Sequence, residues 1–200
     1  MSAGAGSRRR ALLALGLLAV FVGPLLIAAL AYRQGWLEGA GTTNYGTLVR
    51  PPRRVAELSL HGVGGRALET DFLRGRWTFV YVGDARCGAP CRASLYKMRQ
   101  IRLALGEDAP RVQGLYLLTG GEGLSGLREF LREEHPGLAL ARADGAGLRA
   151  FRIEGAGPGG ADRVYLVDPL GNLMMYYRAD ADPSRMLDDL EKLLKVSRVG

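Results

Sequence analysis

The sequence predicts an α/β domain, with a central mixed sheet flanked by helices, behind a single N-terminal transmembrane helix. Three observations lead to this prediction. Residues 11–32 form an uncharged apolar run, short apolar strand patterns alternate with amphipathic helical patterns from residue 55 onward, and turns rich in glycine and proline separate these patterns. A chain of 200 residues is long enough for one ordinary domain in addition to a membrane segment.

The apolar run determines the expected location of the protein. A helix over residues 11–32 would be about 33 Å long, enough to cross a hydrocarbon core of about 30 Å. Three arginines precede the run and only Arg33 follows it closely, so the N-terminus is expected in the cytoplasm. The Ala-Leu-Ala sequence at 29–31 leaves a cleaved signal peptide open, although the apolar run is longer than such peptides usually have. Both interpretations export the rest of the chain, and we expect a single-pass inner (plasma) membrane protein with a periplasmic C-terminal domain.

The chain divides into four predicted regions. They are a cytoplasmic N-terminus at 1–10, the anchor at 11–32, a linker at 33–54 and the folded domain at 55–200. The linker is rich in glycine, threonine and proline, which is typical of a tether. The net charge is +7, but three of the positive charges precede the anchor, which leaves 24 basic against 20 acidic residues. Such a mild excess does not indicate a nucleic-acid partner.

The first half of the domain has two strand patterns, then a helix and a further strand. Residues 55–60 alternate in polarity, as a short strand does, and 77–82 form a continuous apolar run typical of a strand buried on both faces. After Cys91, apolar residues recur every three or four positions as far as Gly106, which predicts a helix. Residues 112–118 form the next apolar strand pattern.

The second half contains two helices and three strands before the final helix. Residues 124–134 keep apolar positions in helical register up to a His-Pro-Gly sequence. A short strand at 138–141 and a brief helix at 148–153 are expected to follow. An Asp-Pro-Leu-Gly-Asn turn joins the strands at 163–167 and 173–177, which predicts a hairpin.

A last helix begins after Asp182, which is the expected N-cap, with Pro183 at the first helical position. Its apolar residues recur on one face as far as Leu194. Without the short strand at 138–141 and the brief helix at 148–153, the order is β–α–β–α–β–β–α with an extra strand in front. A βαβ half followed by a ββα half is the thioredoxin arrangement.

Cys87 and Cys91 are the only cysteines in the chain and carry most of the functional information. They follow the most apolar strand and open a helix, whose N-terminus favours a thiolate over a thiol. Two sulfurs four residues apart can alternate between a dithiol and a disulfide. A purely structural disulfide is the alternative in an exported domain, but it would close a short loop and stabilise only weakly.

The two cysteines are the candidate catalytic residues. We expect Cys87 to be the more exposed, attacking thiol and Cys91, in the first helical turn, to resolve the mixed disulfide. The positive charges of Arg86 and Arg92 would favour a thiolate, and the negative charge of Asp84 would oppose it.

Several segments resemble the Sco/SenC family of thioredoxin-like proteins. They are residues 58–60, 72–77, Gly83 with the cysteine pair, and 165–171, within a similarity that covers about residues 55–195. The three residues between the cysteines are the most specific feature. The resemblance implies a membrane-anchored factor for the copper site of cytochrome c oxidase subunit II. It makes Cu(I) a candidate metal for Cys87 and Cys91, and that subunit a candidate partner.

The sequence departs from the family at the third copper ligand. The family's histidine falls at Gly160, and residues 155–164 contain no histidine. His61 and His135 are both expected at the surface. Cu(I) prefers soft thiolates with a third donor, so the two thiolates alone leave the copper site incomplete. Asp162 stands where thioredoxins carry a cis-proline and is either a substrate-docking residue or an ordinary loop acid.

We therefore expect a membrane-anchored, extracytoplasmic thiol–disulfide oxidoreductase that requires no cofactor. Its substrates would be the thiols of exported proteins, and the resemblance favours a reductase in assembly of the oxidase copper site. A Cu(I)-binding chaperone of the Sco type and a non-catalytic assembly factor stay open as alternatives. The missing histidine counts against the chaperone, and the cysteine pair counts against the non-catalytic factor.

Overall fold

The structure is a computed structural model that describes residues 4–34, 44–63, 68, 71–153 and 163–197. The chain divides into two compact units, Met1–Thr43 and Asn44–Gly200. Each unit is described by itself, since their relative positions are not determined.

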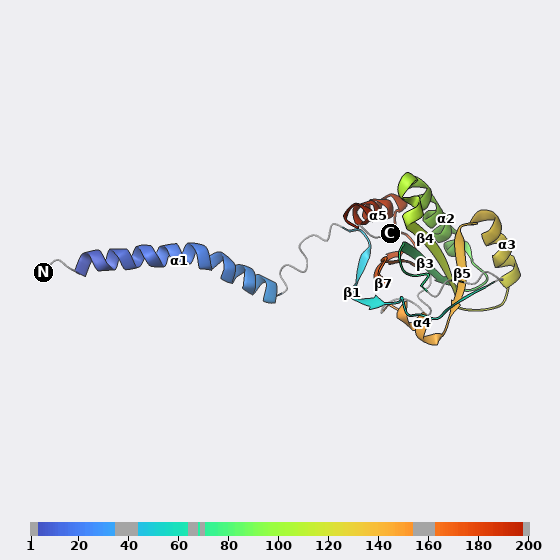
Figure 1. The fold of residues 1–200 in the computed structure, drawn as a ribbon, viewed down its shortest axis with the longest axis horizontal. Helices are drawn as coiled ribbons and strands as arrows, with labels where there is room; N and C mark the ends of the chain where they lie inside the picture. Colours follow the sequence, from blue (N-terminus) through green and yellow to red (C-terminus); the bar gives the residue numbers. More distant parts are fainter. Residues whose placement is uncertain (1–3, 35–43, 64–67, 69–70, 154–162, 198–200) are drawn as a thin grey trace. The chain divides into compact units, whose positions relative to one another are not determined.

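The first unit contains the helix α1 (Gly4–Arg33) (Figure 1). It includes the whole apolar run, and its large apolar side chains, such as Leu17, Phe21 and Leu25, are exposed. The side chains at positions 11, 12, 14 and 32 lie outside the described residues. In the part of the chain that is described, no helix has the length and apolar character needed to cross a membrane. The predicted helix is thus confirmed, whereas the membrane span stays a prediction.

In the described part of the second unit, seven strands form one mixed sheet in the order β1-β7-β6-β3-β4-β5-β2. Strands β3, β4 and β5 run parallel, and the remaining pairs are antiparallel. The parallel strands form the centre, as the apolar pattern of residues 77–82 predicts. The strand bounds are β1 Thr47–Arg54, β2 Leu60–Gly62, β3 Trp77–Gly83, β4 Val112–Leu118, β5 Leu138–Ala143, β6 Arg163–Val167 and β7 Asn172–Arg178.

Helices cover both faces of this sheet. Phe79 and Tyr81 of β3 pack in one apolar cluster with residues of three helices, and the alternate residues Val80 and Val82 pack in another cluster with Phe151. Figure 1 shows α4 on the opposite side of the sheet from α2 and α5. The helices are α2 Ala89–Ala104, α3 Leu124–Glu134, α4 Gly145–Ala150 and α5 Pro183–Val196, with a 3₁₀ helix η1 at Gly106–Arg111.

The start of the domain differs from the prediction. Residues 55–59 do not form a strand, Leu60 begins the short strand β2, and β1 lies in the segment that was expected to be linker. Pro51 and Pro52 lack the N–H that a central strand donates, but β1 pairs only with β7, and its register shifts between Leu48 and Arg53. Prolines are tolerated at such an irregular edge. The linker prediction therefore extended too far, and its residues 35–43 lie outside the described part.

A buried carboxylate joins the beginning of this unit to α5. Asp189 is 2 % exposed and accepts hydrogen bonds from the backbone N–H of Tyr45, at 2.8 Å, and of Gly46, at 2.9 Å. The Tyr177 hydroxyl donates to the same carboxylate oxygen at 3.3 Å. Burial and the Asp189 charge raise the pKa of Tyr177, so this hydroxyl keeps its proton. The contact places residues 45–46 beside α5, at the edge where β1 begins.

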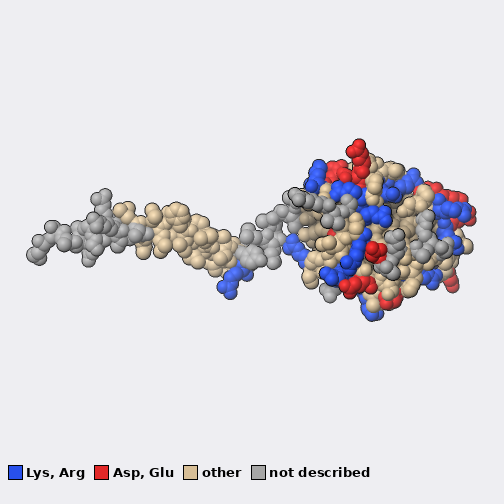
Figure 2. Space-filling view, in the orientation of Figure 1, with Lys and Arg blue, Asp and Glu red and all other residues tan. Residues whose placement is uncertain are grey.

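Charges of both signs are interspersed over the face of this unit seen in Figure 2. Several basic residues have acidic neighbours in sequence, such as Arg111 with Asp108 at 2.9 Å and Arg132 with Glu129 at 2.8 Å. Basic and acidic side chains of this unit thus form local ion pairs on its surface.

Candidate functional site

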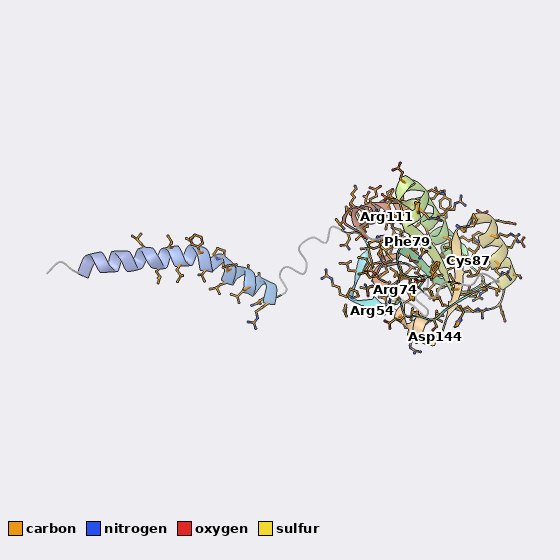
Figure 3. The ribbon with its side chains drawn as sticks, in the orientation of Figure 1. Arg54, Arg74, Phe79, Cys87, Arg111 and Asp144 are labelled. Atoms are coloured by element: carbon orange, nitrogen blue, oxygen red, sulfur yellow. A yellow bond between two sulfur atoms is a disulfide. The ribbon has the colours of Figure 1, made fainter. Side chains whose placement is uncertain are left out.

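The cysteine pair lies where the central strand β3 leads into α2. The strand ends at Gly83, Gly88 is the N-cap of α2, and Pro90 lies in the first helical turn. Cys87 precedes the cap and Cys91 follows it, and the two sulfurs are joined in a disulfide with a Cα–Cα distance of 5.1 Å. Figure 3 labels Cys87 among the side chains of the domain. Both candidate catalytic residues are therefore brought together at a helix N-terminus, as predicted.

The two cysteines are equally buried, each with 4 % of its surface exposed. The expectation that Cys87 is the more exposed residue is therefore wrong for the disulfide state. Cys87 belongs to the apolar cluster under α2 and α3. Arg92 follows the pair, donates from Nε to the Cys87 carbonyl at 3.3 Å, and stacks its guanidinium 4.5 Å from the centre of the Phe130 ring. Packing of α3 against this turn explains the low exposure.

Cys87 also has an unusual backbone conformation. Its φ of 37° lies on the left-handed side, which side chains other than glycine rarely adopt. Such a conformation costs about 1–2 kcal/mol and persists only where surrounding contacts hold it. Here the strain falls on one of the two cysteines.

A tyrosine from the neighbouring strand contacts the second sulfur. The Tyr116 hydroxyl lies 3.5 Å from Cys91 Sγ and donates to the carbonyl oxygen of Asp84 at 2.6 Å. Tyr116 is fully buried, and its ring packs 5.3 Å from that of Tyr81. Burial, with a smaller contribution from the Asp84 charge, raises the pKa of Tyr116, so the phenol stays protonated. Sequence reasoning missed this residue, although a hydroxyl in the middle of an apolar strand was an available signal.

The charged neighbours of the pair contact other groups. The Asp84 carboxylate accepts from the Arg86 backbone N–H at 2.9 Å and from its guanidinium at 2.8 Å. The side-chain hydrogen bond from Arg86 is the main reason that the pKa of Asp84 lies below its usual range. Arg86, which was predicted to favour a thiolate, is thus bound to Asp84. Arg92, for which the same effect was predicted, contacts Phe130 and the Cys87 carbonyl.

The two histidines occupy different environments. His61 is exposed in β2, as expected. His135 is only 7 % exposed, so its predicted surface position is wrong. It caps the C-terminus of α3, and its ring meets the edge of Phe130 at 5.3 Å. Burial, and then the Arg99 charge, lowers the pKa of His135. Gly160 and Asp162 lie outside the described residues.

The family of the chain follows from its sequence. A family described as a transmembrane-like, thioredoxin-like, C-terminal domain matches residues 77–197. The chain belongs to this family. The match begins at β3, covers the cysteine pair and ends just after α5, so it spans the thioredoxin-like half of the chain that holds the site. A comparison with curated protein sequences gives no match.

Solved structures share the fold of this thioredoxin-like protein. Yeast Sco1 with copper bound is 18% identical, covers 78% of this chain and 96% of its own, and has a TM-score of 0.57. A thioredoxin-family thiol:disulfide interchange protein from Chlorobium tepidum is 20% identical, with 72% and 97% covered and a TM-score of 0.54. A putative thioredoxin from Neisseria meningitidis is 16% identical, with 73% and 93% covered and a TM-score of 0.56. These similarities confirm the Sco-like thioredoxin fold that the sequence predicts.

The described surroundings of the sulfurs do not fit a complete Cu(I) site. Among the described residues, no three His, Cys, Asp or Glu side chains gather into a group that could hold a metal. The polar group beside Cys91 is the Tyr116 hydroxyl, which is a hard donor and keeps its proton. Cu(I) prefers thiolate, thioether or imidazole donors. Among the described residues, the site therefore offers Cu(I) the two cysteine sulfurs.

Proposed function

We propose that this protein is a thiol–disulfide oxidoreductase that acts through Cys87 and Cys91 as a reductase of exported protein disulfides. The observation that carries the proposal is the Cys87–Cys91 disulfide at the start of α2, directly after the central strand of a thioredoxin fold. Gly88 has no side chain with which to cap the first turn, so N–H groups there stay available to a thiolate. That turn contains Arg92 and no acidic residue, which also favours negative charge on sulfur.

The reaction begins with the dithiol form of the protein. The Cys87 thiolate attacks one sulfur of the substrate disulfide, a mixed disulfide forms, and the other substrate sulfur leaves as a thiolate. Cys91 then loses its proton and attacks the Cys87 sulfur as a thiolate, which restores the Cys87–Cys91 disulfide and releases the second substrate sulfur, and this sulfur takes up a proton to become a thiol. Two electrons pass to the substrate. An exported dithiol returns two electrons to the protein by the same steps in reverse.

The assignment of the two sulfurs follows from their positions. Cys91 lies inside the first turn of α2, and its sulfur faces the buried Tyr116 hydroxyl. Cys87 lies in the loop before the helix cap, with a strained backbone. A substrate can reach a loop residue by local displacement of the loop, whereas access to Cys91 requires opening of α2. Cys87 is therefore the attacking sulfur and Cys91 the resolving sulfur.

The proposal also includes a location outside the cytoplasm and a specific substrate. The uncharged run at 11–32, preceded by three arginines, supports a membrane tether with the domain on the extracytoplasmic side. The resemblance to the Sco/SenC family supports the cysteines of the oxidase copper site as substrate, since these must be reduced before a metal binds. A reporter fused after Gly200 should be active only outside the cytoplasm, and cytoplasmic activity would overturn this location.

Substrate trapping tests the proposed reaction. The full-length Cys91→Ser variant, reduced and mixed with an oxidised peptide containing one disulfide, should accumulate a mixed disulfide because the resolving sulfur is absent. The matched Cys87→Ser variant should accumulate little. The products are separated by non-reducing electrophoresis and identified by mass spectrometry. Absence of trapping in both variants, with oxidase assembly intact in cells, would replace the oxidoreductase with a non-catalytic assembly factor. Stoichiometric, tight Cu(I) binding that is lost in Cys87→Ser would favour the copper chaperone instead.

A further inference from the structure

The contact between Tyr116 and Cys91 is a polar contact to a reacting sulfur from outside the cysteine turn. The hydroxyl oxygen lies 3.5 Å from Cys91 Sγ and 2.6 Å from the Asp84 carbonyl oxygen. These three groups come from α2, from β4 and from the loop after β3. The contact joins the site to the centre of the sheet, because Tyr116 is paired with Tyr81 in the parallel register of β3 and β4.

The number of hydrogens shows what this contact can do. A neutral phenol has one hydrogen to donate, and the Asp84 carbonyl receives it. Toward Cys91 the phenol therefore presents a lone pair. A disulfide sulfur has no hydrogen, so in the oxidised protein this contact contains no hydrogen bond from sulfur. Once the disulfide is reduced, the Cys91 thiol has an S–H that can be donated to the phenol oxygen.

From this geometry we propose that the Tyr116 hydroxyl stabilises the dithiol state of the pair, by accepting a hydrogen bond from Cys91 that exists only after reduction. The inference rests on the proposed function in that it assumes that the pair alternates between the two states. It assigns to Tyr116 a role in setting the reduction potential, in addition to packing.

The hydroxyl is held in the position that this role requires. Tyr116 is fully buried, so water does not compete for its lone pair. Burial also raises the pKa of the phenol, which keeps it neutral. Gly83 leaves the necessary space, since a Cβ at this position would lie 2.7 Å from the Tyr116 hydroxyl oxygen. The Asp84 carbonyl is fixed in turn because the Asp84 carboxylate binds Arg86.

Reduction of the Cys87–Cys91 disulfide balances as an exchange with an exported dithiol, which acts as the electron donor. The Cys87–Cys91 bond breaks, a disulfide forms in the donor, and two electrons and two protons pass to the protein. One proton stays on Cys91 Sγ, between the sulfur and the Tyr116 oxygen. The other accompanies Cys87, which the helix N-terminus favours as a thiolate that releases this proton to solvent.

Replacement of Tyr116 by phenylalanine removes the hydroxyl and keeps the ring. A buried hydrogen bond of ordinary strength corresponds to about a fivefold change in an equilibrium constant. The dithiol of full-length Tyr116→Phe should therefore be about fivefold less favoured in a glutathione redox buffer. For a two-electron couple, this corresponds to a reduction potential about 20 mV more negative than that of the wild type. The ratio of dithiol to disulfide is measured by alkylation with a mass-tagged maleimide and electrophoresis.

Tyr177→Phe is the matched control. It also removes a buried hydroxyl from the same side of the sheet, but that hydroxyl donates to Asp189 on α5. The control should lose stability without a change in potential. Three results would overturn the inference. They are a dithiol-to-disulfide ratio in Tyr116→Phe within twofold of the wild-type ratio, a change of this ratio in favour of the dithiol, or an equal change of the ratio in both variants. Trapping by Cys91→Ser does not depend on Tyr116, so trapping without a Tyr116 effect would remove only this inference. A Tyr116 effect without trapping would remove only the proposed function.

Discussion

Gly83, the last residue of β3, is the position where one added methyl group should do most damage to the site. A Cβ there would lie 2.7 Å from the Tyr116 hydroxyl oxygen and 2.7 Å from the edge of the Tyr81 ring. Separations below 3.0 Å require something to move, and both rings are buried. Overpacking of this kind typically costs about 1–3 kcal/mol. Gly83→Ala should therefore lower the free energy of unfolding by about 2 kcal/mol.

Gly126→Ala provides the opposite case in the same domain. Gly126 lies in the first turn of α3, and a Cβ there would meet no atom within 4 Å. Alanine within a helix is more stable than glycine by up to about 0.5–1 kcal/mol. The two substitutions add the same methyl group, so the difference between them isolates the effect of the site. We expect the variants to differ by about 3 kcal/mol.

Urea unfolding of the oxidised proteins, followed by far-UV circular dichroism, measures both effects. With a slope of about 2 kcal/mol per M, the midpoint of Gly83→Ala should fall by about 1 M and that of Gly126→Ala should rise slightly. Gly83→Ala should also make the potential of the pair more negative, since displacement of the Tyr116 hydroxyl weakens its contact with Cys91. A Gly83→Ala protein as stable as Gly126→Ala would show that the turn after β3 is looser than its contacts indicate, and the packing argument would fail.

Two further stability predictions concern buried polar groups. Asp189→Asn weakens the acceptor for the Tyr45 and Gly46 N–H groups and should lower the unfolding free energy by about 2 kcal/mol, because hydrogen bonds to a charged acceptor are the stronger kind. Exposed Asp188→Asn is the control, expected within about 0.5 kcal/mol of wild type in urea, and equal losses would contradict the role of the contact. Burial lowers the pKa of His135 in the folded state, so the unfolded chain binds this proton first and stability should fall as the pH drops below about 6.5. His135→Gln should lose less stability than wild type between about pH 7 and pH 5, and parallel curves would contradict the assignment.

The sequence predicted the elements whose signals are local. Strands β4 and β6 and helix α3 have the predicted bounds, because each is a periodic run between turn residues. Helix α4 begins three residues earlier than predicted, since the Asp144 carboxylate caps it by accepting from the Gly147 N–H at 2.6 Å. The predicted start followed the apolar pattern, which begins later, and did not take Asp144 into account.

The prediction that residues 47–54 belong to a linker was wrong for a non-local reason. Strand β1 contains Pro51 and Pro52, which argue against a strand, and its partner β7 is more than a hundred residues away. Only the tertiary fold provides the edge position where those prolines do no harm. His135 is a different case, because its ring contact is with Phe130 only five residues earlier, and its local sequence is typical of an exposed helix end although the residue is buried.

The site shows the same division between local and non-local information. Cys87 and Cys91 could be identified from the sequence because their function requires short spacing at a helix start. For Tyr116 the sequence shows only a hydroxyl within an apolar strand, because its contact with Cys91 depends on the register of β3 and β4, in which Tyr116 pairs with Tyr81. A one-residue slip would turn the hydroxyl to the other face of the sheet, away from the sulfur.

The group beside the resolving sulfur also bears on the choice between sulfur exchange and copper binding. Reduction adds a proton to Cys91, and the phenol oxygen of Tyr116 supplies a hydrogen-bond acceptor for it. Loss of this proton is required both for the resolving attack on Cys87 and for Cu(I) binding. The two functions therefore differ in the third soft donor, which Cu(I) binding needs and exchange does not. The described surroundings do not bring three ligand residues together, and the group that they place beside Cys91 is the hard hydroxyl of Tyr116.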